Sequence, residues 1–160
     1  MRRLRDGDLI AGAGAIALLA AMFLHWYRAA GPDIPPGWTG YGPGAEATAW
    51  QAFGVLDVVL VLLTLPALAL VVTQATRRSP AIPVAFSVLT WIAGTLAALL
   101  ILYRIVNQPG PNDLVEVQAG AWLGLLAALV VAGGGWRSTR NEAMPGLSRS
   151  PIEDLPAPAP

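Results

Sequence analysis

Four long apolar stretches constrain this chain more than any other feature. They cover residues 9–27, 52–73, 84–106 and 119–136. A helix rises about 1.5 Å per residue, so about 20 such residues cross a hydrocarbon core of about 30 Å. The stretches lack period-two alternation, and a lipid-exposed backbone must bond internally, which favours helices. The sequence therefore predicts an all-α, polytopic membrane protein in which residues 1–136 form a four-helix transmembrane bundle of two hairpins.

The composition agrees with a membrane protein and excludes several classes of site. Hydrophobic residues make up 55% of the chain and charged residues 12%, whereas a soluble domain carries about 25% charged residues. The chain has no cysteine and one histidine, so disulfides, cysteine nucleophiles and multi-ligand His/Cys metal sites are excluded. Its net charge of zero offers no basic face to a nucleic acid. We expect neither a metal nor a cofactor.

The distribution of arginine predicts the orientation. Eight of the ten basic residues lie in "MRRLR", "TRRSP" and the tail after the fourth stretch, and the other two are Arg28 and Arg104. Cytoplasmic segments of membrane proteins carry the excess of basic residues. Both termini should therefore be cytoplasmic in a multi-pass protein of the plasma (inner) membrane. Residues 137–160, which end in "PAPAP", should form a disordered cytoplasmic tail.

The first stretch admits a second interpretation, as a cleaved signal peptide. A basic start followed by an apolar run fits such a peptide. However, the nearest small-residue site, "AAGP", would place proline directly after the cut. An uncleaved first helix is the preferred interpretation.

Small residues at helical spacing mark the faces through which the helices should meet. Lipid tails are as apolar as leucine, so membrane helices associate by close backbone approach at such residues. The candidates for helix packing are Gly54, Gly94, Gly120 and Gly124, of which the last two form the GxxxG motif in "GAWLG". We expect a bundle closed at these positions.

One carboxylate interrupts the second stretch. Asp57 lies in "FGVLDVVLVLL", five residues inside the predicted span, or roughly 8 Å below its outer boundary at about 1.5 Å per residue. His25, Arg28 and Arg104 should end on the same side of the membrane. Arginine can reach down from a boundary and hold a carboxylate with two hydrogen bonds. We therefore expect an intramembrane polar cluster of these four residues, with Arg104 the preferred partner of Asp57.

The predicted cluster has two interpretations. It is either a clasp that fixes the register of the helices, which is preferred, or a proton or ligand site of the kind that intramembrane acids often mark. The outer loop "AAGPDIPPGWTGYGPG" adds Trp38 and Tyr41 as candidate contacts, which could rest on the lipid, cap the bundle or cover a ligand.

Aromatic residues should anchor the ends of the spans at the membrane interfaces, where tryptophan and tyrosine are enriched. Those near the outer ends are Trp26, Tyr27, Trp50, Tyr103 and Trp122, and Trp136 lies at the inner end of the fourth stretch. Anchoring is the preferred interpretation for all of them.

The chain contains no sequence motif of a known catalytic site, such as HExxH, GxSxG, a Walker loop or a dinucleotide fingerprint. We therefore expect a non-enzymatic protein, an accessory or scaffold subunit of a membrane complex. Its partners would be the lipid bilayer and either another membrane protein or a second copy of the chain. The alternatives are a small transporter or channel component that uses Asp57, and a lipid- or ligand-sensing membrane module.

Several short motifs recur in one order along the chain. They are "HWYR", a tryptophan-bearing outer loop, "AWQAFGVLD", the inner "RR", and "GAWLGLLAAL" followed by "GGWR". Over about residues 5–140 the chain resembles uncharacterised small four-helix membrane proteins of high-GC actinobacteria. The resemblance implies a four-helix membrane fold and carries no known activity.

Overall fold

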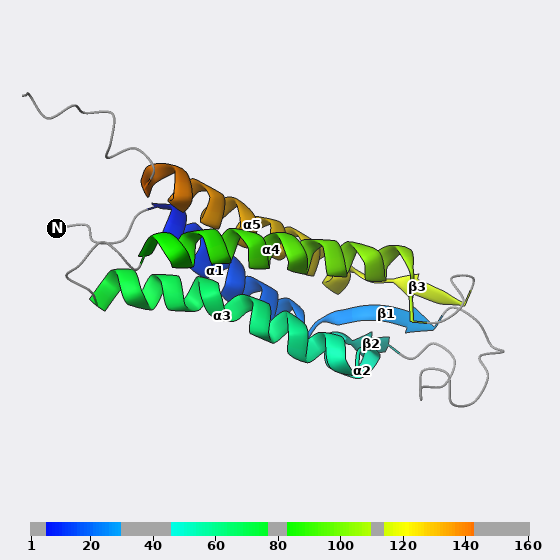
Figure 1. Cartoon of the computed structure of the whole chain (residues 1–160). Helices are drawn as coiled ribbons and strands as arrows, with labels where there is room; N and C mark the ends of the chain where they lie inside the picture. Colours follow the sequence, from blue (N-terminus) through cyan, green and yellow to red (C-terminus); the bar gives the residue numbers. More distant parts are fainter. Residues whose placement is uncertain (1–5, 30–45, 77–82, 110–113, 143–160) are drawn as a thin grey trace, which may run out of the picture.

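The computed structural model describes residues 6–29, 46–76, 83–109 and 114–142. Its helices are α1 (Asp6–Ala21), α2 (Ala49–Ala52), α3 (Val55–Thr76), α4 (Pro83–Val106) and α5 (Ala119–Glu142). Its strands are β1 (His25–Ala29), β2 (Glu46–Thr48) and β3 (Val115–Val117). The four long helices lie side by side, and the strands lie together at one end of them (Figure 1). We call this end the sheet end, and we call the opposite end, where α1 begins and α5 finishes, the terminal end.

Three helices are long and apolar enough to cross a membrane. The candidate spans are Val55–Ala75, Phe86–Val106 and Ala119–Arg140. The described part of α1 has 16 residues, or about 24 Å at about 1.5 Å per residue, which is less than the hydrocarbon core of about 30 Å. The chain is thus mostly helical and suited to a membrane, with three clear candidate spans where the sequence predicted four.

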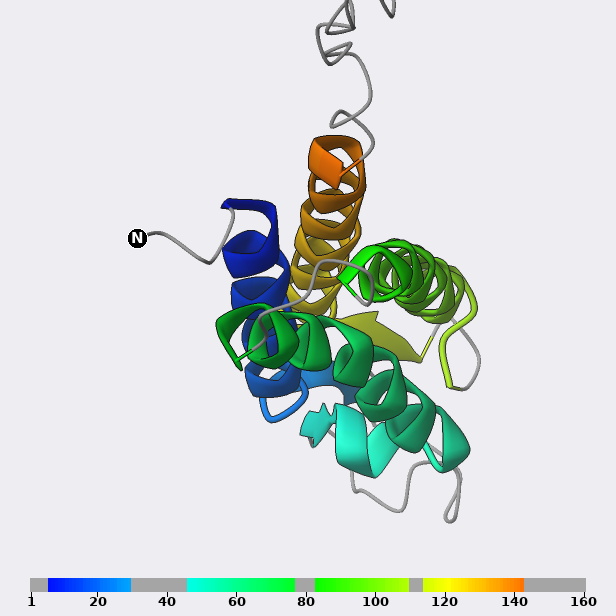
Figure 2. The same cartoon turned by 60° about the vertical axis from the view of Figure 1, so that its left-hand side comes forward.

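Close backbone contacts hold the long helices together. α5 packs against α1 and α4, and α3 packs against α4 and α1, so each long helix has two long neighbours (Figure 2). A Cβ added to Gly134 of α5 would lie 2.4 Å from the backbone nitrogen of Ala11 in α1. A Cβ added to Gly94 of α4 would lie 2.5 Å from the backbone nitrogen of Ala132. Glycine is required here because any side chain would push the helices apart.

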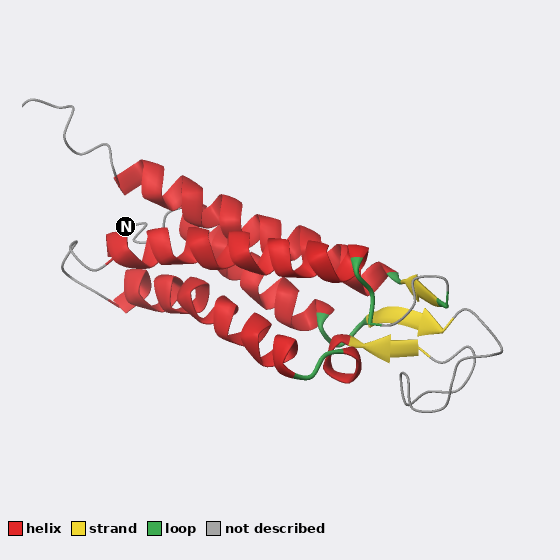
Figure 3. Ribbon diagram, turned by 45° about the vertical axis from the view of Figure 1, so that its right-hand side comes forward, coloured by secondary structure: helices red, strands yellow, loops and turns green. Residues whose placement is uncertain are grey.

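A three-stranded antiparallel sheet corrects the expectation of an all-α fold. Its strand order is β2-β1-β3, and Figure 3 shows it beyond the helix ends. In the register, Arg28 of β1 lies opposite Glu46 of β2 on one side and Glu116 of β3 on the other. The sheet therefore joins both ends of the connection between α1 and α2 to the connection between α4 and α5.

The side chain of Trp26 explains why α1 ends before the predicted boundary at residue 27. Its indole Nε1–H donates to the carbonyl oxygen of Ala21 at 2.7 Å, one of the last carbonyls of a helix, which have no partner within the helix. The chain then turns and enters β1. Trp26 and Tyr27 are almost fully buried, so they are core residues and not the interfacial anchors that the sequence suggested.

The GxxxG motif of α5 accommodates this tryptophan instead of another helix. A Cβ on Gly120 would meet the carbonyl oxygen of His25 at 2.5 Å, and one on Gly124 would meet Cζ2 of Trp26 at 2.6 Å. Phe53 closes the other side of the indole, with ring centroids 5.4 Å apart and an edge-to-face angle of 88°. The motif thus fixes the sheet end to α5.

Gly54 is not in close contact with any other element, in contrast to the other three candidate glycines. It is exposed, and a Cβ there would meet no atom within 4 Å. It lies in the break between α2 and α3, directly after Phe53, whose backbone is extended (φ −113°, ψ 145°). At the other end of the predicted bundle, α5 continues to Glu142 and so includes six residues that were expected to belong to the tail.

Candidate functional site: two polar clusters

The first group of polar residues lies on the exposed surface of the sheet end. His25 and Arg28, both on β1, bond to Glu46 of β2: His25 Nδ1 is 3.0 Å from Oε2, and Arg28 Nε donates to Oε1 at 3.1 Å. A second nitrogen of Arg28, Nη2, also contacts Oε1. Antiparallel pairing produces this arrangement because it sets Arg28 directly opposite Glu46. Sequence analysis missed Glu46, since nothing in the sequence indicated a strand there.

These contacts shift the ionisation of both partners. The hydrogen bond from Arg28 lowers the pKa of the Glu46 carboxyl below its ordinary value of 4.5, although burial opposes that shift. The same hydrogen bond raises the pKa of the Arg28 guanidinium. The pair is therefore ionised at neutral pH. Arg28 is exposed and Glu46 is partly exposed, so the pair favours the register of β1 and β2 more than it stabilises the fold.

Tyr27 connects the sheet to the end of α4. Its hydroxyl donates to the carbonyl oxygen of Arg104 at 2.9 Å. Burial raises the pKa of Tyr27 to about 12, against a smaller opposing effect of the Arg104 cation. The Arg104 guanidinium carbon lies 4.9 Å from the centre of the Phe53 ring, in a cation–π contact. Arg104 thus binds an aromatic ring and not the carboxylate that the sequence suggested.

Asp57 occupies the first turn of α3. Its Oδ1 accepts a hydrogen bond from the backbone nitrogen of Val58 at 2.7 Å. The first N–H groups of a helix have no carbonyl partner within the helix, and the helix dipole favours negative charge there. This location answers how an oily segment tolerates a carboxylate. The acid lies in the first turn of the helix, close to one end of the candidate span Val55–Ala75, where a backbone N–H group compensates it.

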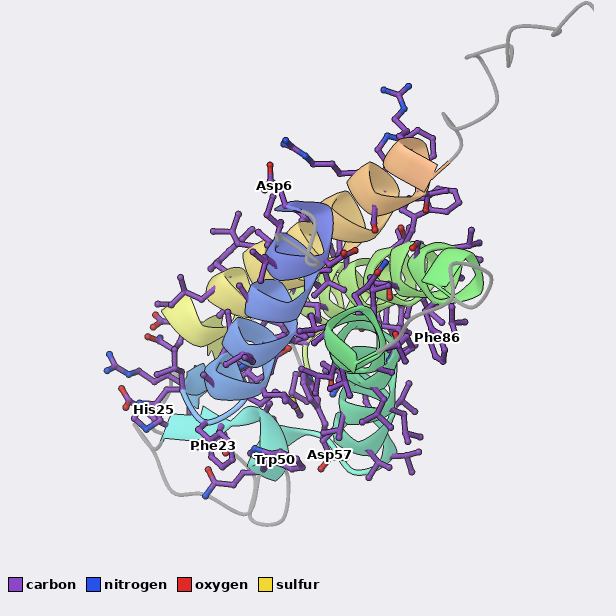
Figure 4. All side chains as sticks on the ribbon, turned by 90° about the vertical axis from the view of Figure 1, so that its left-hand side faces the viewer. Asp6, Phe23, His25, Trp50, Asp57 and Phe86 are labelled. Carbon is purple, nitrogen blue, oxygen red and sulfur yellow. The ribbon has the colours of Figure 1, made fainter. Side chains whose placement is uncertain are left out.

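The predicted cluster is thus divided between separate contacts. In the part of the chain that the structure describes, no ion pair joins Asp57 to Arg104, and His25 and Arg28 both bond to Glu46. Figure 4 shows His25 and Asp57 on either side of Phe23 and Trp50, whose rings are 5.7 Å apart. Trp38 and Tyr41 lie outside the described residues.

The second group lies inside the terminal end and was not predicted from the sequence. Asp8 of α1 is fully buried, and the hydroxyl of Ser138 in α5 donates to its Oδ1. The Ser138 hydroxyl is also 3.4 Å from the hydroxyl of Ser87 in α4. Asp8, Ser138 and Ser87 thus link three helices, and we call them the Asp8 cluster. Close approach makes it possible: a Cβ on Gly7 would lie 2.7 Å from the backbone nitrogen of Ser138.

Thr90 extends the polar line by one turn of α4. It is fully buried, and within the described part of the chain its hydroxyl oxygen has no hydrogen-bond partner. It faces α5 near Gly135, where an added Cβ would lie 3.0 Å from the backbone carbon of Thr90. The i, i+3 spacing of Ser87 and Thr90 was the available signal for a polar seam on α4. The sequence did not indicate that Asp8 would join that seam.

Neither group resembles a metal centre or a familiar catalytic constellation. In the described residues, no three His, Asp or Glu side chains come close enough together to hold a metal ion. A lone carboxylate with two hydroxyls can fix helices in register or take part in the binding of a small cation or a proton. Comparison with protein-family models, with curated proteins and with solved structures finds no match to this chain.

Proposed function

We propose that this protein is a non-enzymatic accessory or scaffold subunit of a membrane complex. All four long helices would cross the plasma membrane, with the terminal end cytoplasmic and the sheet outside. Its partner would be another membrane protein or a second copy of the chain. The arginine distribution supports the orientation, because eight of ten arginines belong to the terminal end and its connections.

The observation that carries this proposal is the contrast between the interior and the outer faces of the helices. Inside, glycines bring the backbones of α1, α4 and α5 to within van der Waals contact at several levels. Such close contact leaves no width for an organic solute between these helices. Outside, large apolar side chains are exposed on every long helix, where they would contact lipid or another protein.

The exposed face of α3 is the most regular of these surfaces. Its large exposed residues are spaced three, four or seven positions apart, which places them on one side of the helix. They are Val55, Val58, Leu62, Leu65 and Val72. α3 also has the smallest buried share of the three candidate spans, 28%. A helix of a partner subunit would pack along this stripe by the same i, i+3 and i+4 geometry.

The short helix α1 can still cross the membrane in this proposal. Its outward residues Leu9, Ile10 and Ile16 are exposed and apolar, as a lipid-facing surface requires. Directly after α1, Phe23 and Leu24 are exposed as well and lengthen the apolar surface toward the sheet. Local thinning of the bilayer accommodates a remaining mismatch at a cost of fractions of a kcal/mol per Å.

Single-cysteine crosslinking tests the proposal directly, because the chain has no native cysteine. A photoactivatable crosslinker would be attached in native membranes at one exposed residue of each clear span, Leu62, Leu99 or Leu126, and at buried Leu60 as a control. We expect one defined protein adduct from one helix face and none from the control. A protein that forms no adduct and transports a solute when reconstituted alone would contradict the proposal.

The orientation has a separate test. Topology reporters fused after Gly40 and after Pro160 should report opposite sides of the membrane. If both reporters lie on the same side of the membrane, the predicted orientation is wrong, but the crosslinking result is unaffected. The two parts of the proposal can therefore fail independently.

A second candidate function, a small transporter component, is favoured by the Asp8 cluster alone. A buried carboxylate beside hydroxyls from three helices has the chemistry that couples cations or protons to transport. In that case the reconstituted protein would carry a cation or proton flux that Asp8→Asn abolishes and the exposed control Asp6→Asn preserves. Absence of flux in liposomes would leave the scaffold proposal as the better account.

A further inference from the structure

Two tryptophans and one arginine form an exposed patch at the terminal end. Trp91 of α4 and Trp136 of α5 have ring centroids 5.2 Å apart, and the guanidinium carbon of Arg140 lies 5.1 Å from the centre of the Trp136 ring. The two tryptophans are 38% and 44% exposed. Gly135 brings them together, since a Cβ there would lie 2.5 Å from the backbone nitrogen of Trp91. We call these three residues the Trp–Arg patch.

The patch presents hydrogen-bond donors without acceptors. Buried Trp26 donates its indole N–H to a carbonyl, but no hydrogen bond of the described residues uses the indole N–H of Trp91 or Trp136. Arg140 likewise forms no ion pair within the described part of the chain. Neighbouring Arg137 does, with Asp6 at 3.6 Å. The guanidinium of Arg140 and the two indole N–H groups, one on α4 and one on α5, can therefore donate to an acceptor such as a phosphate.

Exposed apolar side chains next to the patch indicate that its ligand also has an apolar part. Ile92 and Leu96 of α4 and Leu129 of α5 are also exposed, and they lie on the side of the two tryptophans that faces the sheet end. In the proposed orientation these side chains face the acyl chains of the cytoplasmic leaflet, while the patch lies at headgroup depth, where tryptophan is favoured. A ligand that fits must carry a phosphate above a hydrocarbon tail, which is the structure of a phospholipid and not of a free anion.

We propose that the Trp–Arg patch binds the headgroup of an anionic phospholipid in the cytoplasmic leaflet. Arg140 pairs with the phosphate oxygens, and the indole N–H groups donate to phosphate or ester oxygens. A choline headgroup would be disfavoured because the guanidinium already covers a face of Trp136 and repels a second cation. The inference rests on the membrane insertion that the proposed function assumes, but it needs no partner protein.

The chain offers a matched control for each member of the patch. Trp122 lies near the opposite end of the same helix and is similarly exposed, at 51%, and in the described residues no ring or cation contacts it. Arg28 is an exposed arginine at the sheet end that is paired with Glu46. Trp136→Phe and Arg140→Gln can thus be compared with Trp122→Phe and Arg28→Gln.

The test uses the full-length protein in nanodiscs of phosphatidylcholine with and without phosphatidylglycerol. Native mass spectrometry after release into detergent would count retained lipids, and circular dichroism would verify that each variant keeps its helix content. We expect wild-type protein to retain phosphatidylglycerol over phosphatidylcholine. Loss of one arginine at the surface should reduce that preference roughly fivefold in Arg140→Gln. Trp136→Phe should reduce it less, and both control variants should match the wild type.

Two further arms define the outcomes. Fluorescence quenching by brominated phosphatidylglycerol should exceed quenching by brominated phosphatidylcholine in wild type, and Trp136→Phe should remove most of this excess. Soluble glycerol phosphate should not displace the lipid. Displacement would show that the site binds the headgroup alone, and the proposal of a phospholipid ligand would be wrong. Equal preference in Arg140→Gln and Arg28→Gln would also overturn the inference. Absence of quenching by either brominated lipid would instead show that the protein is not inserted, and the proposed function would fail with it.

Discussion

The two ends of the molecule handle polar residues in opposite ways. At the terminal end, Asp8 and its serine partners are buried between three helices whose backbones touch. At the sheet end, Arg28 and Glu46 pair on an exposed strand surface. A buried polar group must keep its partner or lose the free energy of its hydration, whereas an exposed group can return to water. The terminal end should therefore tolerate far less change than the sheet end.

The largest expected effect comes from the helix contact that encloses the Asp8 cluster. Gly134→Leu places a side chain where even a Cβ would lie 2.4 Å from the backbone of Ala11. Because backbone cannot move as a flexible side chain does, α1 and α5 must separate. Overpacking costs about 1–3 kcal/mol and occasionally more, and we expect this variant at or above the upper end. Thermal unfolding in mild detergent, followed by circular dichroism, measures the loss.

The adjacent glycine is the control for this prediction. Gly133 is exposed, and a Cβ there meets no atom within 4 Å. Gly133→Ala should leave stability unchanged or raise it by up to about 1 kcal/mol, because alanine favours a helix more than glycine does. Equal destabilisation by Gly133→Ala and Gly134→Ala would show that helix propensity, and not contact between α1 and α5, explains the result.

Next in size is the removal of the buried carboxylate. Asp8→Ala deprives the Ser138 hydroxyl of its acceptor inside the interface. A buried group left without a partner costs about 1–3 kcal/mol, so we expect a loss near 2 kcal/mol. Asp6 is exposed, and Asp6→Ala should change stability little. If the two aspartates prove equivalent in denaturation experiments, the Asp8 cluster does not stabilise the terminal end.

A smaller effect is expected from Tyr27, which is buried although it belongs to the sheet end. Tyr27→Phe removes the hydrogen bond to the Arg104 carbonyl and should cost about 1 kcal/mol. The raised pKa adds a pH dependence. The folded state holds the phenol proton up to pH about 12, whereas the unfolded state releases it near 10. Stability should be unaffected below pH 10 and should fall between pH 10 and 12.

Ultraviolet titration separates this tyrosine from the others. The difference between wild-type and Tyr27→Phe absorbance should contain one phenol that ionises near pH 12. The stability of the variant should not show the added decline between pH 10 and 12. An ordinary pKa in the difference spectrum would mean that Tyr27 is solvated in the folded protein.

The comparison of the two ends also explains which elements the sequence could predict. The central segments of α3, α4 and α5 could be predicted from their uninterrupted apolar sequence, because a long apolar segment in a membrane can form little else than a helix. The end of α1 does not follow from it. "HWYR" reads as the end of an apolar helix until the indole of Trp26 is seen to bond to Ala21 and to fit over Gly124. The contact between Trp26 and Gly124 joins residues about a hundred positions apart, and no local pattern in the sequence reveals it.

The polar residues follow the same division. The apolar neighbours of Asp57 marked it in the sequence as an unusual carboxylate. Its location within the first turn of α3 depends, however, on a helix break at Phe53 and Gly54. Nothing in the sequence indicated that Asp8 is buried, because it lies near the basic segment "MRRLR" at the apparent boundary of the first stretch. Its burial depends on Gly7 and Gly134, which let α1 approach α5. The sequence predicted close approach of the helices at small residues, but it did not indicate which polar group they would enclose.

The smallest expected effect tests the exposed pair at the sheet end. The hydrogen bond from Arg28 lowers the pKa of Glu46, so the folded state favours the ionised carboxylate. This contribution is complete above pH 4.5, the ordinary value, and is lost as the pH falls through the lower pKa of the folded state. Wild-type stability should therefore show a shallow acid decline that Glu46→Gln and Arg28→Gln both remove. If the acid decline were as large as the loss of stability in Asp8→Ala, the sheet end would depend on its ionic pair as strongly as the terminal end depends on the Asp8 cluster.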